Sequence, residues 1–243
     1  MKFKIIATAL FLSFFLNGNA QILKDAMNKG KDVMKGNNSG PLTNEEVVRG
    51  LKEALSTGAK KSSEAAARVD GFNKNPKIFI PWPAEAQSMK ERLVKMGMEK
   101  KVTEFEVSMN RAAEEAAKEA YGIFADAVTG MSVGDGFAIL NGGDTAATHY
   151  LREKTFAPLK VKFTPIVKAA IDKVQVTAYW NPLVTTYNKL PGVTKQNPDI
   201  EDYITNKAIN GLMILISEQE AKIRRDPAAQ ASELLKRVFG GGK

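Results

Sequence analysis

The chain contains no cysteine and a single histidine, His149, among its 243 residues. Without cysteine it can form no disulfide, no zinc–thiolate site and no thiol nucleophile or redox centre. The same absence excludes a bacterial lipoprotein, which needs a lipid-modified N-terminal cysteine. A serine–histidine–aspartate triad would have to use His149, yet no Gly-x-Ser-x-Gly turn is present to carry the serine. We therefore expect stability to come from packing, with no cofactor and no metal.

Long hydrophobic runs are also scarce. One apolar run, from Ile5 to Leu16, follows Lys2 and Lys4 and ends in the small and polar residues 17–20. This is the pattern of a secretory signal peptide, and the run is shorter than the 20 or so apolar residues that span a bilayer. Residues 1–20 are thus predicted to be cleaved, leaving an exported, soluble protein, expected in the bacterial periplasm. The later run 211–216 is short enough to be a buried helix turn, so no transmembrane segment is expected after cleavage.

Charge of one sign is only moderately in excess. The formal net charge is +8, and loss of Lys2 and Lys4 would lower it to +6. The lysines are scattered among glutamates, without a basic run that contains aromatic residues. We therefore expect no nucleic-acid partner.

Residues 21–42 are predicted to be a flexible linker because glycines, asparagines and lysines interrupt them. An alternative is a weak amphipathic helix over residues 22–34. It would associate with a membrane surface through Ile22, Leu23, Met27 and Val33, with lysines facing anionic lipid.

From Thr43 to residue 240 the signals are almost entirely helical, which predicts an all-α fold with one multi-helix domain over residues 43–240. Thr43 and Glu46 have the spacing of a capping box, and Asp144 and Asp199 stand where N-caps belong. Apolar spacing and proline positions predict helices up to residue 69, near 84, and over 99–129, 132–140, 144–156, 158–173, 176–189, 199–224 and 227–238. Pro182 is expected to kink or split its helix.

Residues 75–83 are the clearest exception, because three prolines within eight residues disfavour a helix. We predict an extended, proline-rich strap across the helices, with Ile78, Ile80 and Trp82 as inward anchors or as a partner-binding site.

Several short sequence phrases follow one another in a distinctive order and spacing. They are Gly50-Leu51-Lys52-Glu53-Ala54-Leu55, Asp70-Gly71-Phe72, Asn75-Pro76, Ile80-Pro81, Met109-Asn110-Arg111-Ala112-Ala113-Glu114, Ile139-Leu140-Asn141-Gly142, Ala146-Ala147-Thr148, Phe163 with Pro165-Ile166-Val167, Arg224-Arg225-Asp226-Pro227-Ala228-Ala229 and Val238-Phe239-Gly240. Together these phrases resemble a family of exported bacterial proteins known as a domain of unknown function, DUF4197. The resemblance covers residues 43–240 and implies one helical domain outside the cytoplasm, with no activity to carry over.

The candidate polar site is Asn110, Arg111, Glu114 and Glu115, which are neighbours on one helix. Such a group is either a structural ion-pair network or part of a ligand site. Acid–base or metal chemistry would need carboxylates from other helices. The candidates for that role are Asp126, Asp135, Asp199, Glu201 and Asp202.

The glycine loop 141–144 before a helix suggests a phosphate site, but capping by Asp144 explains it more simply.

These features favour an exported protein without catalysis that binds an unknown protein or small molecule. The alternative is a hydrolase or metal-assisted enzyme that uses these carboxylates and His149.

Overall fold

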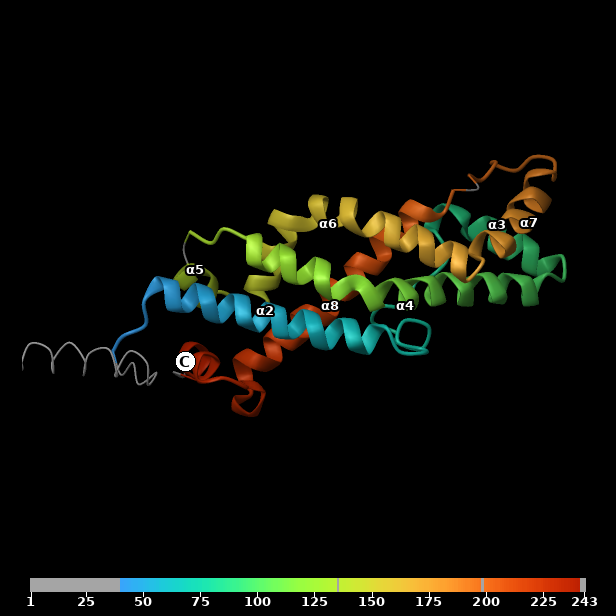
Figure 1. Cartoon of the computed structure of the whole chain (residues 1–243). Coiled ribbons are helices and arrows are strands. Elements are labelled where there is room, and N and C mark those ends of the chain that lie inside the picture. The colour runs from blue at the N-terminus through green and yellow to red at the C-terminus, as the bar shows by residue number, and fades with distance from the viewer. Residues whose placement is uncertain (1–39, 135, 198, 241–243) are drawn as a thin grey trace, which may run out of the picture. The chain divides into compact units, whose positions relative to one another are not determined.

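The computed structural model describes residues 40–134, 136–197 and 199–240 (Figure 1). The chain divides into two compact units, Met1–Pro41 and Leu42–Lys243, and nearly all of the described residues belong to the second unit. The predicted signal peptide, most of the predicted linker, the segment 22–34 and Asp135 lie outside the described residues.

The described residues form helices joined by turns and irregular segments, and they contain no strand. This confirms the predicted all-α fold. The elements, with η for a short 3-10 helix, are α2 (Asn44–Ala66), η1 (Ala84–Ala86), α3 (Gln87–Lys95), α4 (Glu99–Gly130), α5 (Gly136–Leu140), α6 (Ala146–Lys173), α7 (Val176–Asn188), α8 (Glu201–Arg225), η2 (Pro227–Ala229) and α9 (Glu233–Phe239).

Four long helices form the core of the second unit. Helix α4 packs against α2 and α6, and α8 packs against the same two helices, so the four close into a ring (Figure 1). The apolar side chains of α4 include a stripe of alanines that is fully buried, and their small volume allows close helix contacts. Helices α3 and α7 pack at one end of α4, whereas α5 and α9 pack on α2. No helix of the described segments is long and apolar enough to cross a membrane.

The predicted capping box at the start of α2 is confirmed. The Thr43 hydroxyl accepts from the Glu46 amide, and the Glu46 carboxylate accepts from the Thr43 amide. The N-cap position predicted for Asp199 is wrong: the N-cap of α8 is Ile200, and Asp199 lies one residue before it, where its carboxylate accepts from the Glu201 amide at 3.0 Å. The role predicted for Asp144 is wrong: the N-cap of α6 is Thr145, which makes no side-chain capping bond.

Two predicted helix breaks are wrong. Helix α6 continues through Pro158, where two helices were predicted, and α7 continues through Pro182, so Pro182 does not split its helix. Pro165 also lies inside α6. All three prolines are exposed. A carbonyl that loses its amide donor to a proline can bind water on such a face, while the opposite face of the helix stays packed.

Between α2 and α3 the chain forms turns from Ala67 to Ile78 and then irregular backbone to Pro83. Ile80 donates its amide to Asn110 Oδ1 at 2.8 Å, and its carbonyl accepts from Asn110 Nδ2 at 3.0 Å. The amide side chain of Asn110 therefore pairs with the strap much as a neighbouring strand would. The Tyr203 hydroxyl adds a hydrogen bond to the Pro81 carbonyl at 2.8 Å.

Candidate functional site between helices α4 and α6

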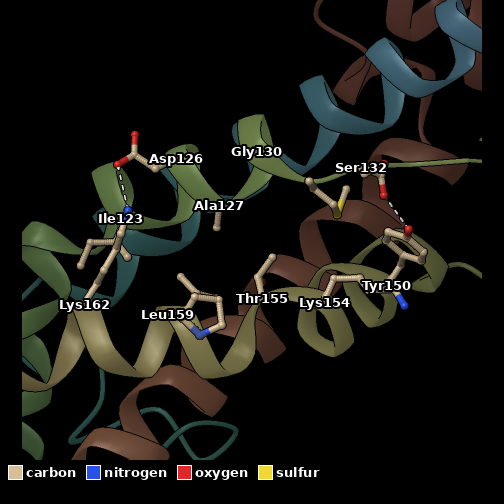
Figure 2. Close-up of a pocket in the computed structure, with 12 residues that line it drawn as sticks. Ile123, Asp126, Ala127, Gly130, Ser132, Tyr150, Lys154, Thr155, Leu159 and Lys162 are labelled. Atoms are coloured by element: carbon tan, nitrogen blue, oxygen red, sulfur yellow. Dashed lines mark hydrogen bonds and ion pairs between the residues drawn. The ribbon is translucent and has the colours of Figure 1, made fainter.

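A groove of about 430 Å³ lies between the C-terminal part of α4 and the first half of α6 (Figure 2). The lining residues of each helix recur every three or four positions, so each helix contributes one face. The groove is lined by Ile123, Asp126, Ala127 and Gly130 of α4, by Met131 and Ser132 after it, and by Tyr150, Lys154, Thr155, Pro158, Leu159 and Lys162 of α6.

Small residues of α4 leave the space that forms the groove. Ala127 and Gly130 face it, and a Cβ placed on Gly130 would meet no atom within 4 Å. The large neighbours Phe124 and Val128 are buried in the core instead. The floor is apolar, because Ala127 and Leu159 lie along its middle and Ile123 lies beside the Lys162 end (Figure 2).

Polar side chains lie at the two ends. At one end Lys162 Nζ is 3.6 Å from Asp126 Oδ2, an ion pair that joins α6 to α4 across the groove (Figure 2). At the other end the Tyr150 hydroxyl donates to the Ser132 carbonyl at 2.6 Å. Lys154 Nζ lies 5.6 Å from the centre of the Tyr150 ring, within the range of a cation–π contact. The arrangement can hold an apolar body between two polar ends.

The candidate polar site predicted on α4 is separated by the fold into different structures. Asn110 is fully buried and its side chain is used by Ile80 and by the Glu106 carbonyl. Glu114 is also buried, and its Oε1 accepts from the Phe72 and Asn73 amides, both at 3.1 Å. Both residues thus hold the segment between α2 and α3 against α4.

Arg111 completes this second contact. It donates to Glu114 at 2.6 Å and to Asp70 at 2.7 Å, and Asp70 has a left-handed backbone with φ of 67°. Lys74, then Asn73 and Arg111, bind the Asp70 carboxylate and lower its pKa well below the usual value. The hydrogen bond to Glu114 in turn raises the pKa of the Arg111 guanidinium. The cluster fixes a turn and its polar groups already have partners.

Glu115 lies apart from this cluster. It pairs with Lys118 at 2.6 Å and with Lys173 of α6, and these two lysines lower the pKa of its carboxyl group. Arg111 binds Glu114 and Asp70, whereas Glu115 binds two lysines, so Arg111 and Glu115 do not form one site.

The three strap residues predicted as anchors or as a partner site belong to the core. Ile80 is fully buried, and Ile78 and Trp82 are 4% and 2% exposed. The Trp82 ring packs edge-on against Phe105 at 4.9 Å and Trp180 at 5.5 Å. Because they are enclosed by helices, these side chains offer no surface to a partner.

The carboxylates proposed for acid–base or metal chemistry lie in two places and already have partners. Asp126 of α4 pairs with Lys162. At the start of α8, Glu201 pairs with Lys168 and Asp202 with Lys160, while Asp199 accepts from the Glu201 amide. No three histidine, aspartate or glutamate side chains of the described residues are close enough to share a metal ion. His149 is exposed on α6, beside Arg152 in a smaller hollow.

The glycine loop before α6 is not available to phosphate, because Glu220 of α8 already occupies the helix start. This fully buried carboxylate accepts from the Ala147 amide at 3.0 Å and the Thr148 amide at 2.7 Å. Arg224 binds Glu220 at 2.9 Å and donates to the carbonyls of Leu140 and Ile139. A carboxylate from another helix thus does what was predicted for Asp144.

Sequence reasoning missed both Glu220 and the groove. The charged pair Glu220 and Arg224 looks like an exposed helix end, since the chain gives no sign that α6 begins beside it. For the groove a weak signal exists: Ala127 and Gly130 are small residues on the apolar side of a long helix. That signal alone does not separate a groove from a close helix contact.

Comparison with known proteins gives a family but no described activity. Residues 41–240 match the family described as "Protein of unknown function (DUF4197)". No curated protein and no solved structure shows significant similarity to the chain. Since the match covers most of the chain, the protein belongs to the DUF4197 family.

Proposed function

We propose that the protein is exported and acts without catalysis, by binding the apolar body of a small molecule in the groove between α4 and α6. One observation carries the proposal: the groove encloses about 430 Å³ over an apolar floor, with polar groups at its ends. Small-molecule sites have this composition, and their volumes are typically about 300–1,000 Å³.

The size also argues for a small molecule rather than a protein partner. A stable protein–protein interface buries about 800 Å² on each side, far more than this groove provides.

Ligand binding is tested with N-phenyl-1-naphthylamine, an uncharged apolar dye that fluoresces when it leaves water. We expect saturable binding to the wild-type protein and at least about tenfold weaker binding to Ala127→Phe, whose ring fills the floor. Ala157→Phe is the matched control, because Ala157 is exposed on α6 and does not line the groove. Equal affinity of wild type and Ala127→Phe, or no saturable binding, would contradict the proposal.

Export rests on the pattern of residues 1–20 and needs its own test. The full chain, expressed in a Gram-negative host, should appear in the periplasm with an N-terminus near Gln21. Leu12→Arg interrupts the apolar run and should keep the uncleaved chain in the cytoplasm. An uncleaved wild-type chain would contradict this part of the proposal.

A further inference from the structure

The charges that line the groove are not balanced. Asp126 is the one carboxylate among the described lining residues, while Lys154 and Lys162 are both cations. Lys162 lies 3.6 Å from Asp126, its carboxylate partner within the lining. The lining therefore carries one excess positive charge, and Lys154 is the cation that has no carboxylate partner among the lining residues.

Lys154 does have an ion-pair partner, but that partner lies outside the groove. Glu153 is 3.4 Å from Lys154, is the preceding residue and does not line the groove. Neighbouring residues of a helix face different directions, so Glu153 can hold Lys154 only weakly in this position. The Glu153 side chain is 73% exposed, as is that of Asp126, and an ion pair at such exposure contributes little.

Tyr150 places the ammonium of Lys154 at one end of the groove. The ammonium lies 5.6 Å from the centre of the Tyr150 ring, and the ring is anchored by its hydroxyl to the Ser132 carbonyl. The hydroxyl proton is used in that bond. Lys154 makes one long hydrogen bond to Glu153, at 3.4 Å, so its other N–H donors are the groups left to bind an anion. Tyr150 is a positioning residue for Lys154.

The surface between the two ends suits a methylene chain. From Lys154 to Lys162 the α6 backbone rises by about 12 Å. Ile123, Ala127 and Leu159 lie along this stretch, and the Thr155 hydroxyl donates to the Leu151 carbonyl at 2.5 Å. The described middle of the groove thus offers no polar side chain in need of a partner.

We propose, on the basis of the function proposed above, that the groove binds a free single-chain amphiphile with an anionic head, of the medium-chain carboxylate class. The carboxylate binds the ammonium of Lys154, and the alkyl chain lies on the apolar floor and points towards Lys162 and Asp126. Charge complementarity selects an anion, and the groove's volume selects one monomeric chain rather than a bilayer surface.

The test uses three probes with the same chain, below their micellar concentrations: dodecanoate, dodecanol and dodecyltrimethylammonium. Each is titrated against protein that holds N-phenyl-1-naphthylamine. We expect dodecanoate to displace the dye about tenfold more tightly than the cationic probe, with the alcohol between them. The preference should shrink as salt is added.

Lys154→Gln should weaken dodecanoate about tenfold while the neutral dye still binds as in wild type. Lys160→Gln is the matched control, because Lys160 pairs with Asp202 and does not line the groove. Equal affinity for all three probes, or no effect of Lys154→Gln, would contradict the proposed preference for an anionic head group. The groove would then remain a binding site for an apolar molecule only.

Two further results would overturn the assignment in other ways. Dodecanoate binding that is unchanged in Ala127→Phe would place the amphiphile elsewhere. Binding to anionic phosphatidylglycerol vesicles without binding of monomeric dodecanoate would indicate a membrane surface instead. Failure of the dye itself to bind would count against the proposed function.

Discussion

At the scale of single residues, two buried carboxylates connect segments that are distant in the chain. Glu114 of α4 binds backbone amides that follow α2, and Glu220 of α8 binds amides at the start of α6. Each also pairs with an arginine of its own helix, Arg111 or Arg224. A carboxylate in this setting is a structural group, because its acceptor sites are used within the protein.

Replacing Glu220 with glutamine should destabilise the fold by about 3 kcal/mol. The amide nitrogen would face other N–H donors, and Arg224 would lose the charge that it neutralises. Chemical denaturation measures the loss. The matched control is Glu218→Gln, since Glu218 is 40% exposed and should change stability by less than about 0.5 kcal/mol. Similar losses in the two variants would contradict the role of Glu220.

Asp70 should make stability depend on pH under acid conditions. Its pKa is lowered in the folded protein, first by Lys74 and then by Asn73 and Arg111, from about 4 in an unfolded chain. Its stabilising effect is therefore complete above pH of about 4 and is lost as the pH falls from there towards the folded pKa.

The Asp70→Asn variant should be less stable than wild type at pH 7, and the difference should shrink below pH 4. Asparagine tolerates the left-handed backbone at this position, so the charge is the main change. Stability is measured by denaturation between pH 2 and 7, with exposed Asp172→Asn as control. A difference that is constant across this range would contradict the account.

At the scale of elements, local sequence patterns predict where a helix lies more reliably than they predict whether it is interrupted. The range 99–129 predicted for α4 agrees with Glu99–Gly130 to within a residue. Pro158, in contrast, was predicted to separate two helices that the structure joins in α6. The prediction considered only that proline removes a hydrogen bond within the helix. The packing of α6 against α4 and α8 stabilises the helix, and this packing is not visible in the local sequence.

The packing of α9 on α2 depends on a glycine. A Cβ at Gly50 would lie 2.7 Å from Val238 Cγ2, closer than two carbon atoms can approach. Gly50→Ala should therefore destabilise the protein by about 1–3 kcal/mol, and Val238→Ala should relieve part of this loss in the double variant. Urea unfolding of all three variants gives the coupling.

The control for helix propensity is Gly122→Ala in α4, where an added Cβ meets nothing within 4 Å. This change should be neutral or stabilising by up to about 1 kcal/mol. If the loss of stability in the double variant equals the sum of the losses in Gly50→Ala and Val238→Ala, the two positions do not compete for space.

At the scale of the whole molecule, several of the sequence phrases that resemble the family meet at two junctions. Residues 70–72 and Ile80 contact residues 110–114 at the strap, and residues 139–140 contact Arg224 beside the start of α6. The class of fold and the neighbouring positions of Asn110, Arg111 and Glu114 on α4 could be predicted, since they depend on local spacing.

The groove and Glu220 could not be predicted, because each arises where elements from different parts of the chain come together. Asn110 and Glu114 were recognised as notable residues, yet their roles depend on partners 30 to 42 positions away. Only packing distinguishes a buried network from a ligand site in such a group.

The central claim, that the groove between α4 and α6 is a ligand site, is tested most directly by methyl NMR during titration with dodecanoate. The methyl groups of Ala127, Met131 and Leu159 line the groove. Those of Leu235 and Val238 belong to α9 and do not line the groove. The account predicts that the first three signals shift together and saturate while the last two stay in place. Shifts spread evenly over all five residues, or no shift in the first three, would contradict it.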